Sequence, residues 1–192
     1  LRYIQTADWV QIQAVSGSLF DASDAIDEAL ADLRAGTQLK IPAGRIKVTR
    51  THAISKAFRF SGTSPDLGGG SSILVRDPAL DAPAFILGGG ELDDDPFISG
   101  IYMDNILFLE GQTYIPGGAL KTAHFMHING YAKSGMENVY FAGDMIGAWL
   151  YFRRSQDAEF RNIFCRGGGS DLGPYAQILI GDPQVSEETG DH

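Results

Sequence analysis

The side chains best suited to binding or catalysis recur at matched positions in two segments, 125–128 and 149–154. Aligning the segments places Phe125 beside Trp149 and His127 beside Tyr151. If these positions face solvent, the rings can stack on the apolar faces of sugars while histidine and arginine tips bond hydroxyl or acid groups. Alternatively, a loop or a second chain covers the same rings. The pattern predicts a carbohydrate-binding groove that contains Phe125, His127, Trp149, Tyr151, Arg153 and Arg154.

Two carboxylates near these segments are the candidate catalytic groups. Asp144 lies in the turn before the second segment, and Asp157 lies just beyond it. Hydrolysis of a glycosidic bond needs two carboxyl groups roughly 5–10 Å apart. A uronate lyase instead needs a base and a cation that neutralises the uronate. We predict Asp144 and Asp157 as the candidate pair, with carboxylates that merely share neighbouring turns as the alternative.

One acidic loop could bind a metal ion. It contains Glu91, Asp93, Asp94 and Asp95, and carboxylate oxygens are the ligands that calcium prefers. A solvated acidic turn is the alternative. No other cofactor is expected.

The remaining reactive groups are expected to be structural. Cys165 continues an apolar column, so it should lie in the core, and a single cysteine excludes an internal disulfide. His124 and His127 are three residues apart on an expected strand and should face opposite sides. His52 is expected in a turn without a partner.

One helix and many short strands must position these groups. Residues 21–33 place Ile26, Ala29, Leu30 and Leu33 on one face, which predicts an amphipathic helix with an acidic first turn. After Gly36 the pattern changes to β-rich runs separated by turns, in a chain with 24 glycines. The expected strands are 38–41, 45–49, 58–61, 73–76 and 84–87.

A repeat indicates how the strands are arranged. Segments 103–108, 136–141 and 160–165 align on Asn105, Asn138 and Asn162, which are 33 and then 24 residues apart. Each asparagine is expected just before its strand, in a left-handed bend, with its amide bonded to the next copy about 4.8 Å away. A strand period of two then predicts three inward columns: Met103, Met136 and Phe160; Ile106, Val139 and Ile163; Phe108, Phe141 and Cys165. It also predicts an outward column of Leu107, Tyr140 and Phe164, suited to an interface, and a surface ion pair between Glu137 and Arg161.

Matched copies at a constant offset predict an all-β fold, a parallel β-helix, with the right hand expected from the crossover preference. The expected organisation is a strand segment and capping helix at 1–36, the solenoid at 37–185 and a disordered tail at 186–192.

The N-terminal part resembles the start of pectate-lyase-like β-helix proteins. The resemblance rests on the Asp/Ala-rich helix, on Gln38–Val48 with Pro42 and Gly44, and on Phe58–Gly62 before a turn-rich link. It is similar in particular to phage tailspike and tail-associated depolymerase chains, and to secreted polysaccharide lyases and epimerases. The resemblance implies a helix that caps the solenoid, a longer parent chain and a homotrimer.

The net charge and the length of the apolar runs indicate which classes of partner to expect. The net charge of −9 repels phosphate backbones, so nucleic acid is not an expected partner. No apolar run approaches the roughly 18 residues of a membrane-spanning helix. The resemblance implies a tailspike-like β-helix that recognises a cell-surface polysaccharide and is a candidate depolymerase, located on a virion tail or outside the cell. The alternatives are a secreted polysaccharide lyase or hydrolase, and a purely structural trimeric spike or adaptor.

Overall fold

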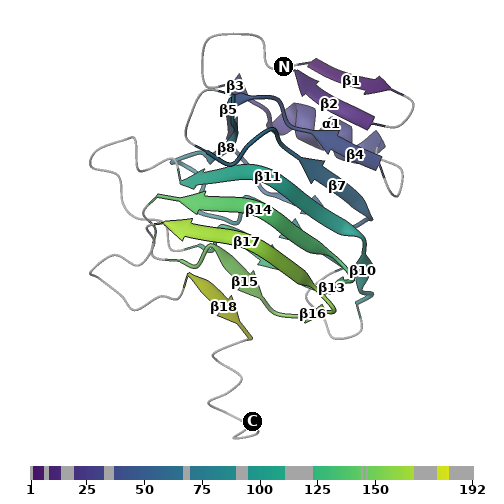
Figure 1. The fold of residues 1–192 in the computed structure, drawn as a ribbon, viewed down its shortest axis with the longest axis vertical. Coiled ribbons are helices and arrows are strands. Elements are labelled where there is room, and N and C mark those ends of the chain that lie inside the picture. The colour runs from purple at the N-terminus through teal and green to yellow at the C-terminus, as the bar shows by residue number, and fades with distance from the viewer. Residues whose placement is uncertain are drawn as a thin grey trace, which may run out of the picture.

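The computed structural model describes residues 2–6, 9–13, 20–32, 37–66, 70–89, 95–110, 123–143, 145, 147–166 and 177–181. These residues form one short helix and many strands, most of them paired in parallel (Figure 1). The predicted all-β class is confirmed. In the described part of the chain, no helix combines the length and apolar character needed to cross a membrane.

The chain begins with an antiparallel pair, β1 (Arg2–Thr6) and β2 (Trp9–Gln13), followed by the short strand β3 (Phe20–Asp21) and the helix α1 (Ser23–Asp32). Strand β2 pairs in parallel with β4 (Thr37–Lys40), and β3 pairs in parallel with β5 (Gly44–Val48). These are the earliest strands of the largest sheet.

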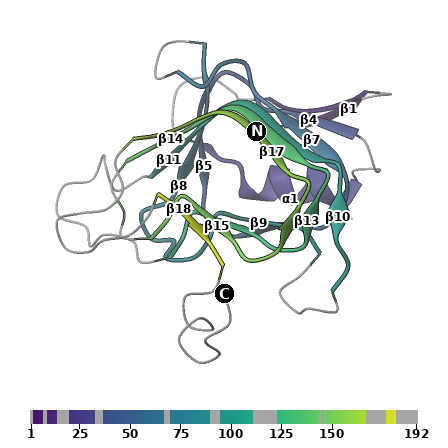
Figure 2. The same ribbon diagram turned by 60° about the horizontal axis from the view of Figure 1, so that its bottom comes forward.

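The rest of the chain forms three sheets, which it visits in a fixed order from β8 (Ser72–Arg76) onward. The ten-stranded sheet adds β7 (Phe58–Ser61), β8 (Ser72–Arg76), β11 (Ile101–Glu110), β14 (Gly135–Ala142) and β17 (Glu159–Arg166). The five-stranded sheet contains β6 (His52–Ile54), β9 (Phe85–Leu87), β12 (Met126–Ile128), β15 (Leu150–Phe152) and β18 (Ile178–Ile180). The three-stranded sheet contains β10 (Ile98–Ser99), β13 (Tyr131–Ala132) and β16 (Ser155–Gln156). Viewed from the end turned toward the reader in Figure 2, these strands surround the core.

The predicted register of the repeat is confirmed. Met103 pairs with Met136, which pairs with Phe160, and the other two inward columns follow in step. Their members are fully buried in β11 and β14 and half-buried in β17. Like side chains therefore stack on like, one strand spacing apart.

The asparagines lie within the strands, not before them. Asn105, Asn138 and Asn162 have φ of 56°, 52° and 51°, so each bends a strand that continues on both sides. The amide of Asn138 donates to Oδ1 of Asn105 at 3.3 Å, and the amide of Asn162 donates to Oδ1 of Asn138 at 3.0 Å. The predicted left-handed bend and amide ladder are both confirmed.

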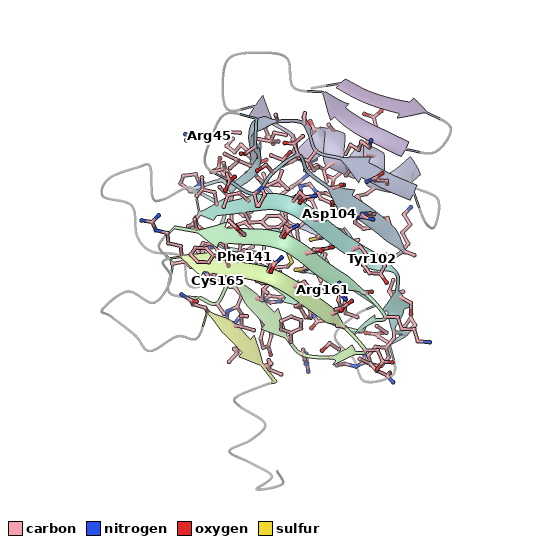
Figure 3. All side chains as sticks on the ribbon, viewed as in Figure 1. Arg45, Tyr102, Asp104, Phe141, Arg161 and Cys165 are labelled. Atoms are coloured by element: carbon pink, nitrogen blue, oxygen red, sulfur yellow. The ribbon has the colours of Figure 1, made fainter. Side chains whose placement is uncertain are left out.

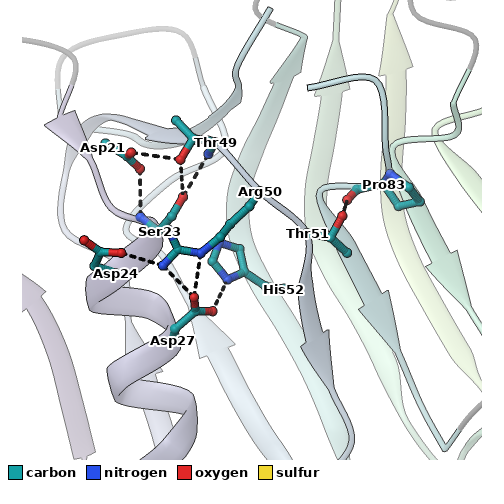
Figure 4. A network of polar contacts seen from close by, with 9 residues as sticks. All are labelled: Asp21, Ser23, Asp24, Asp27, Thr49, Arg50, Thr51, His52 and Pro83. Atoms are coloured by element: carbon teal, nitrogen blue, oxygen red, sulfur yellow. Dashed lines mark hydrogen bonds and ion pairs between the residues drawn. The ribbon is translucent and has the colours of Figure 1, made fainter. Parts of the chain in front are cut away.

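A polar network joins α1 to the strands beside it (Figure 4). Arg50 reaches Asp24 and Asp27, and Ser23 Oγ accepts the N–H of Thr49 at 2.8 Å. Ile26 and Ala29 are fully buried, so the apolar face of the helix packs into the core.

His52 belongs to this network, and the expectation of a partnerless turn residue is wrong. It lies in β6, is buried, and its Nδ1 is 2.6 Å from Oδ1 of Asp27. Burial lowers the pKa of His52 despite the Asp27 carboxylate. Its Nε2 is buried without a hydrogen-bond partner among the described residues, which fits a neutral ring that donates from Nδ1.

Candidate functional site

A shallow groove of about 220 Å³ crosses the outer side of β7, β11, β14 and β17. It lies over the first half of these strands, before the asparagine bends (Figure 3). Six of its nine lining residues are charged or aromatic, one each on β7 and β14 and two each on β11 and β17. The lining residues are Arg59, Tyr102, Met103, Asp104, Gly135, Met136, Glu137, Glu159 and Arg161.

Gly135 is one of the lining residues of the groove. In the pairing register it stands between Tyr102 of β11 and Glu159 of β17. A Cβ at this position would lie 2.5 Å from the Glu159 carbonyl oxygen and 3.6 Å from Cδ1 of Tyr102, so the backbone of β17 approaches too closely for a side chain to fit. The outward column therefore has no side chain between Tyr102 and Glu159, and this position is the gap in the column.

Tyr102 forms one wall of that gap. Its side chain is 46% exposed, and its hydroxyl donates to the carbonyl of Lys133 at 3.0 Å. The hydrogen bond holds the ring in place while part of its surface stays open to solvent. An anchored, exposed aromatic ring is suited to stacking against a ligand face.

An ion pair closes one end of the groove. Nε of Arg59 is 2.6 Å from Oδ2 of Asp104, whose other oxygen accepts from Ser61 Oγ at 2.7 Å and from the amide of Asn105 at 2.9 Å. Asp104 is only 4% exposed. The hydrogen bond to Asp104 raises the pKa of Arg59. Three donors therefore hold the Asp104 carboxylate in place.

A second ion pair lies on β17. The Arg161 guanidinium contacts Oε1 of Glu159 through Nε at 2.7 Å and through Nη2 at 2.5 Å. The predicted ion pair between Glu137 and Arg161 is therefore wrong, although the two residues are neighbours in the register. Arg161 bonds within its own strand because Glu159 lies two residues away on the same face.

The predicted carbohydrate site is divided by the structure. Phe125 and Trp149 are fully buried, with ring centroids 5.6 Å apart, so the expectation that they face solvent is wrong. Both precede their strands by one residue, and Met126 and Leu150, which follow them, are also buried. The chain turns at this point, so the alternation of a strand cannot be extended back to these residues.

His127 and Tyr151 are half-buried neighbours in the five-stranded sheet. Their rings lie 5.2 Å apart, and His124 joins them, 5.5 Å from His127 and 4.8 Å from Tyr151. The expected separation of the two histidines is wrong because His124 precedes β12 and does not share its alternation. Nδ1 of His124 accepts the N–H of Ala148 at 2.9 Å, and burial together with the charge of Arg76 lowers its pKa. This aromatic cluster is a secondary candidate site.

The two predicted arginines, Arg153 and Arg154, follow directly after β15. Arg153 is exposed. The Arg154 guanidinium lies 4.7 Å from the Phe97 ring centroid and donates to the carbonyl of Asp95 at 3.0 Å. Arg154 therefore ties down the segment before β10.

The predicted catalytic pair and calcium loop fall largely outside the described residues. Asp144, Glu91, Asp93 and Asp94 are not described, and neither is the tail from residue 182. Asp157 is exposed at a φ of 51° and borders an apolar pocket of about 580 Å³ with Phe160 and Ile178. Among the described residues, no group of three or more histidine, cysteine or acidic side chains is placed to hold a metal ion.

Cys165 is half-buried and packs against the core, as predicted. Burial raises the pKa of its thiol to about 11, so the thiolate is scarce at neutral pH.

The repeat in the sequence carries a signal for most of the groove. The alignment that pairs Met103 with Met136 also stacks Tyr102, Gly135 and Glu159, and beside them Asp104, Glu137 and Arg161. Arg59 enters from β7 through a pairing with Tyr102 that no local pattern indicates.

Comparison of the chain with protein-family models, with curated proteins and with solved structures found no match.

Proposed function

We propose that this chain is a right-handed parallel β-helix that binds a cell-surface polysaccharide in the groove over β7, β11, β14 and β17. The fixed order of visits to three parallel sheets, the stacked inward columns and the asparagine ladder support a solenoid. The right hand follows from the preference of parallel crossover connections. The packed helix α1 and the resemblance to pectate-lyase-like proteins support the same assignment.

The exposed ring of Tyr102 beside the gap at Gly135 is the observation that carries the binding proposal. A sugar presents an apolar face to an aromatic ring and hydroxyl groups at its edge. Arg59, Glu137 and Arg161 surround the gap with groups that can donate to or accept from those hydroxyls. The groove is open rather than enclosed, which suits an internal stretch of a polymer.

Cleavage of the bound polymer is a further part of the proposal. Its candidate groups in the groove are Asp104 and Glu137, which are direct neighbours on adjacent strands. Glu137 is exposed, whereas both oxygens of Asp104 are bonded, to Arg59, Ser61 and Asn105, so hydrolysis by this pair would need Asp104 to be released from those donors. Asp144 and Asp157 remain the pair predicted from the sequence.

A second candidate role, a trimeric spike, rests on the outward apolar column. Leu107 is buried with Ile73 and Leu109, whereas Phe164 at the end of the column is 54% exposed, 5.4 Å from Tyr140 by ring centroids. An apolar stripe that becomes exposed along the sheet suits contact with other copies of the chain. A homotrimer on a virion tail is the proposal that joins this stripe to polysaccharide binding; a monomer would favour a free secreted enzyme.

The experiment is affinity electrophoresis through gels that contain bacterial or plant polysaccharides, with reducing ends measured in the same samples. Tyr102→Ala should abolish the retardation that the wild-type chain shows. Phe97→Ala is the matched control, because Phe97 is 42% exposed, close to the 46% of Tyr102, and does not line the groove.

Tyr151→Ala tests the secondary cluster. Loss of retardation in this variant but not in Tyr102→Ala would transfer the site to the five-stranded sheet. Retardation by none of the polysaccharides, with Phe164→Ala dissociating an oligomer, would favour the structural role.

A further inference from the structure

Both positively charged side chains of the groove are already paired with carboxylates. Of its two cations, Arg59 is bonded to Asp104 and Arg161 is bonded to Glu159. Three carboxylates and two guanidinium groups line the groove, so its formal charge is −1. Both cations are already neutralised before any ligand arrives.

Glu137 is the exception among the charged lining residues. It is exposed, stands between Asp104 and Arg161 in the register, and makes no hydrogen bond or ion pair with any residue that the structure describes. Its charge is nevertheless close enough to contribute to the raised pKa of Arg59. A carboxylate in this state is an acceptor available to a ligand.

We infer that the groove selects a neutral or amino-bearing glycan and disfavours a polyuronate, an inference that rests on the proposed polysaccharide binding. Sugar hydroxyl or ammonium groups can donate to Glu137, and an ammonium forms the stronger, charge-assisted bond. A uronate would place its carboxylate beside Glu137 without a cation to neutralise it.

Recruiting a cation for a uronate is costly in this groove. Taking Arg59 would leave Asp104, 4% exposed, without its charge partner, and breaking a buried pair on one side is strongly unfavourable. Arg161 is exposed and could turn away from Glu159, but that would leave two unpaired carboxylates, Glu137 and Glu159, beside the ligand. The same reasoning disfavours a uronate lyase reaction at this site, because that reaction needs an available cation.

The test is an array of neutral, amino-sugar and uronate oligosaccharides, including chitin, chitosan and oligogalacturonate fragments. Only signals lost in Tyr102→Ala are counted as groove binding. The expected hits are neutral or amino glycans, and Glu137→Gln should weaken binding of amino glycans by about tenfold or more. Glu137→Lys should shift preference toward uronates.

Glu28→Lys is the matched control for net charge, because Glu28 is exposed on the helix far from the groove. It should leave the preference unchanged. Groove binding confined to uronates, or unaltered by Glu137→Lys, would overturn the inference while leaving polysaccharide binding intact. No signal that depends on Tyr102 for any glycan would overturn the proposed function itself.

Discussion

Substitutions in the asparagine ladder can measure how much one stacked asparagine contributes to the free energy of unfolding. Asn138 is the central member and takes part in both side-chain hydrogen bonds of the ladder, whereas Asn162 takes part in one. Both residues have the same left-handed backbone, with φ of 52° and 51°. Replacing each by alanine, and Asn138 also by glycine, therefore separates the hydrogen bonds from the backbone strain.

The magnitudes follow from the two contributions. A net hydrogen bond contributes about 0.5–1.5 kcal/mol, and a left-handed conformation costs an ordinary L-residue about 1–2 kcal/mol. Asn138→Ala should therefore lower the free energy of unfolding by about 2–4 kcal/mol, and Asn162→Ala by about one hydrogen bond less. Asn138→Gly loses the same hydrogen bonds without the strain, so it should be less damaging than alanine by about 1 kcal/mol.

Urea unfolding, followed by circular dichroism, gives the assay. The midpoint should shift while the slope stays constant, because the surface exposed on unfolding is unchanged. Equal losses for Asn138→Ala and Asn162→Ala would refute the contribution of the ladder. Equal losses for alanine and glycine at 138 would show that the left-handed backbone imposes no cost there.

Three further substitutions test the core and its polar contacts. Because burial holds the pKa of His52 below its ordinary value of 6.5, stability should fall as the pH drops below about 6.5, and His52→Gln should flatten that decline in unfolding midpoints; an unchanged profile would contradict a buried neutral ring. The ion pair of Arg76 and Glu110 is fully buried, so Arg76→Met should lower the free energy of unfolding by about 3–5 kcal/mol. Combining Arg76→Met with Glu110→Gln should recover part of that loss, whereas additive losses in urea titrations would argue against coupling. Trp149→Ala should cost about 3–5 kcal/mol through an unfilled core position; retained stability with loss of glycan retardation would restore the predicted sugar contact.

The repeat was predictable because its determinants are local. Strand alternation places Met103, Ile106 and Phe108 on one side, and matched spacing brings the next copy into register. Burial then favours like side chains in stacked columns. The asparagine was predictable for a similar reason, since its side chain tolerates a left-handed bend and can bond the copy above it.

The predictions that proved wrong concern residues at turns of the chain and residues whose partners are distant in sequence. Phe125 and Trp149 lie at the corners before β12 and β15, so the alternation that orients His127 and Tyr151 does not apply to them. His52 meets Asp27 across 25 residues, a contact that no local pattern indicates. A period of two is thus a reliable guide inside a strand and a poor one at its first residue.

The position of the groove follows from the same stacking that builds the core. Each outward column presents one position per strand, and contacts also cross between columns: Arg59, which pairs with Tyr102, reaches Asp104. Gly135 is the groove position that contributes no side chain. A Cβ there would lie 2.5 Å from the Glu159 carbonyl oxygen, so the close approach of β17 requires glycine at this position. Stacking therefore fixes Gly135, and its neighbours in the column, Tyr102 and Glu159, supply the side chains that a ligand would contact.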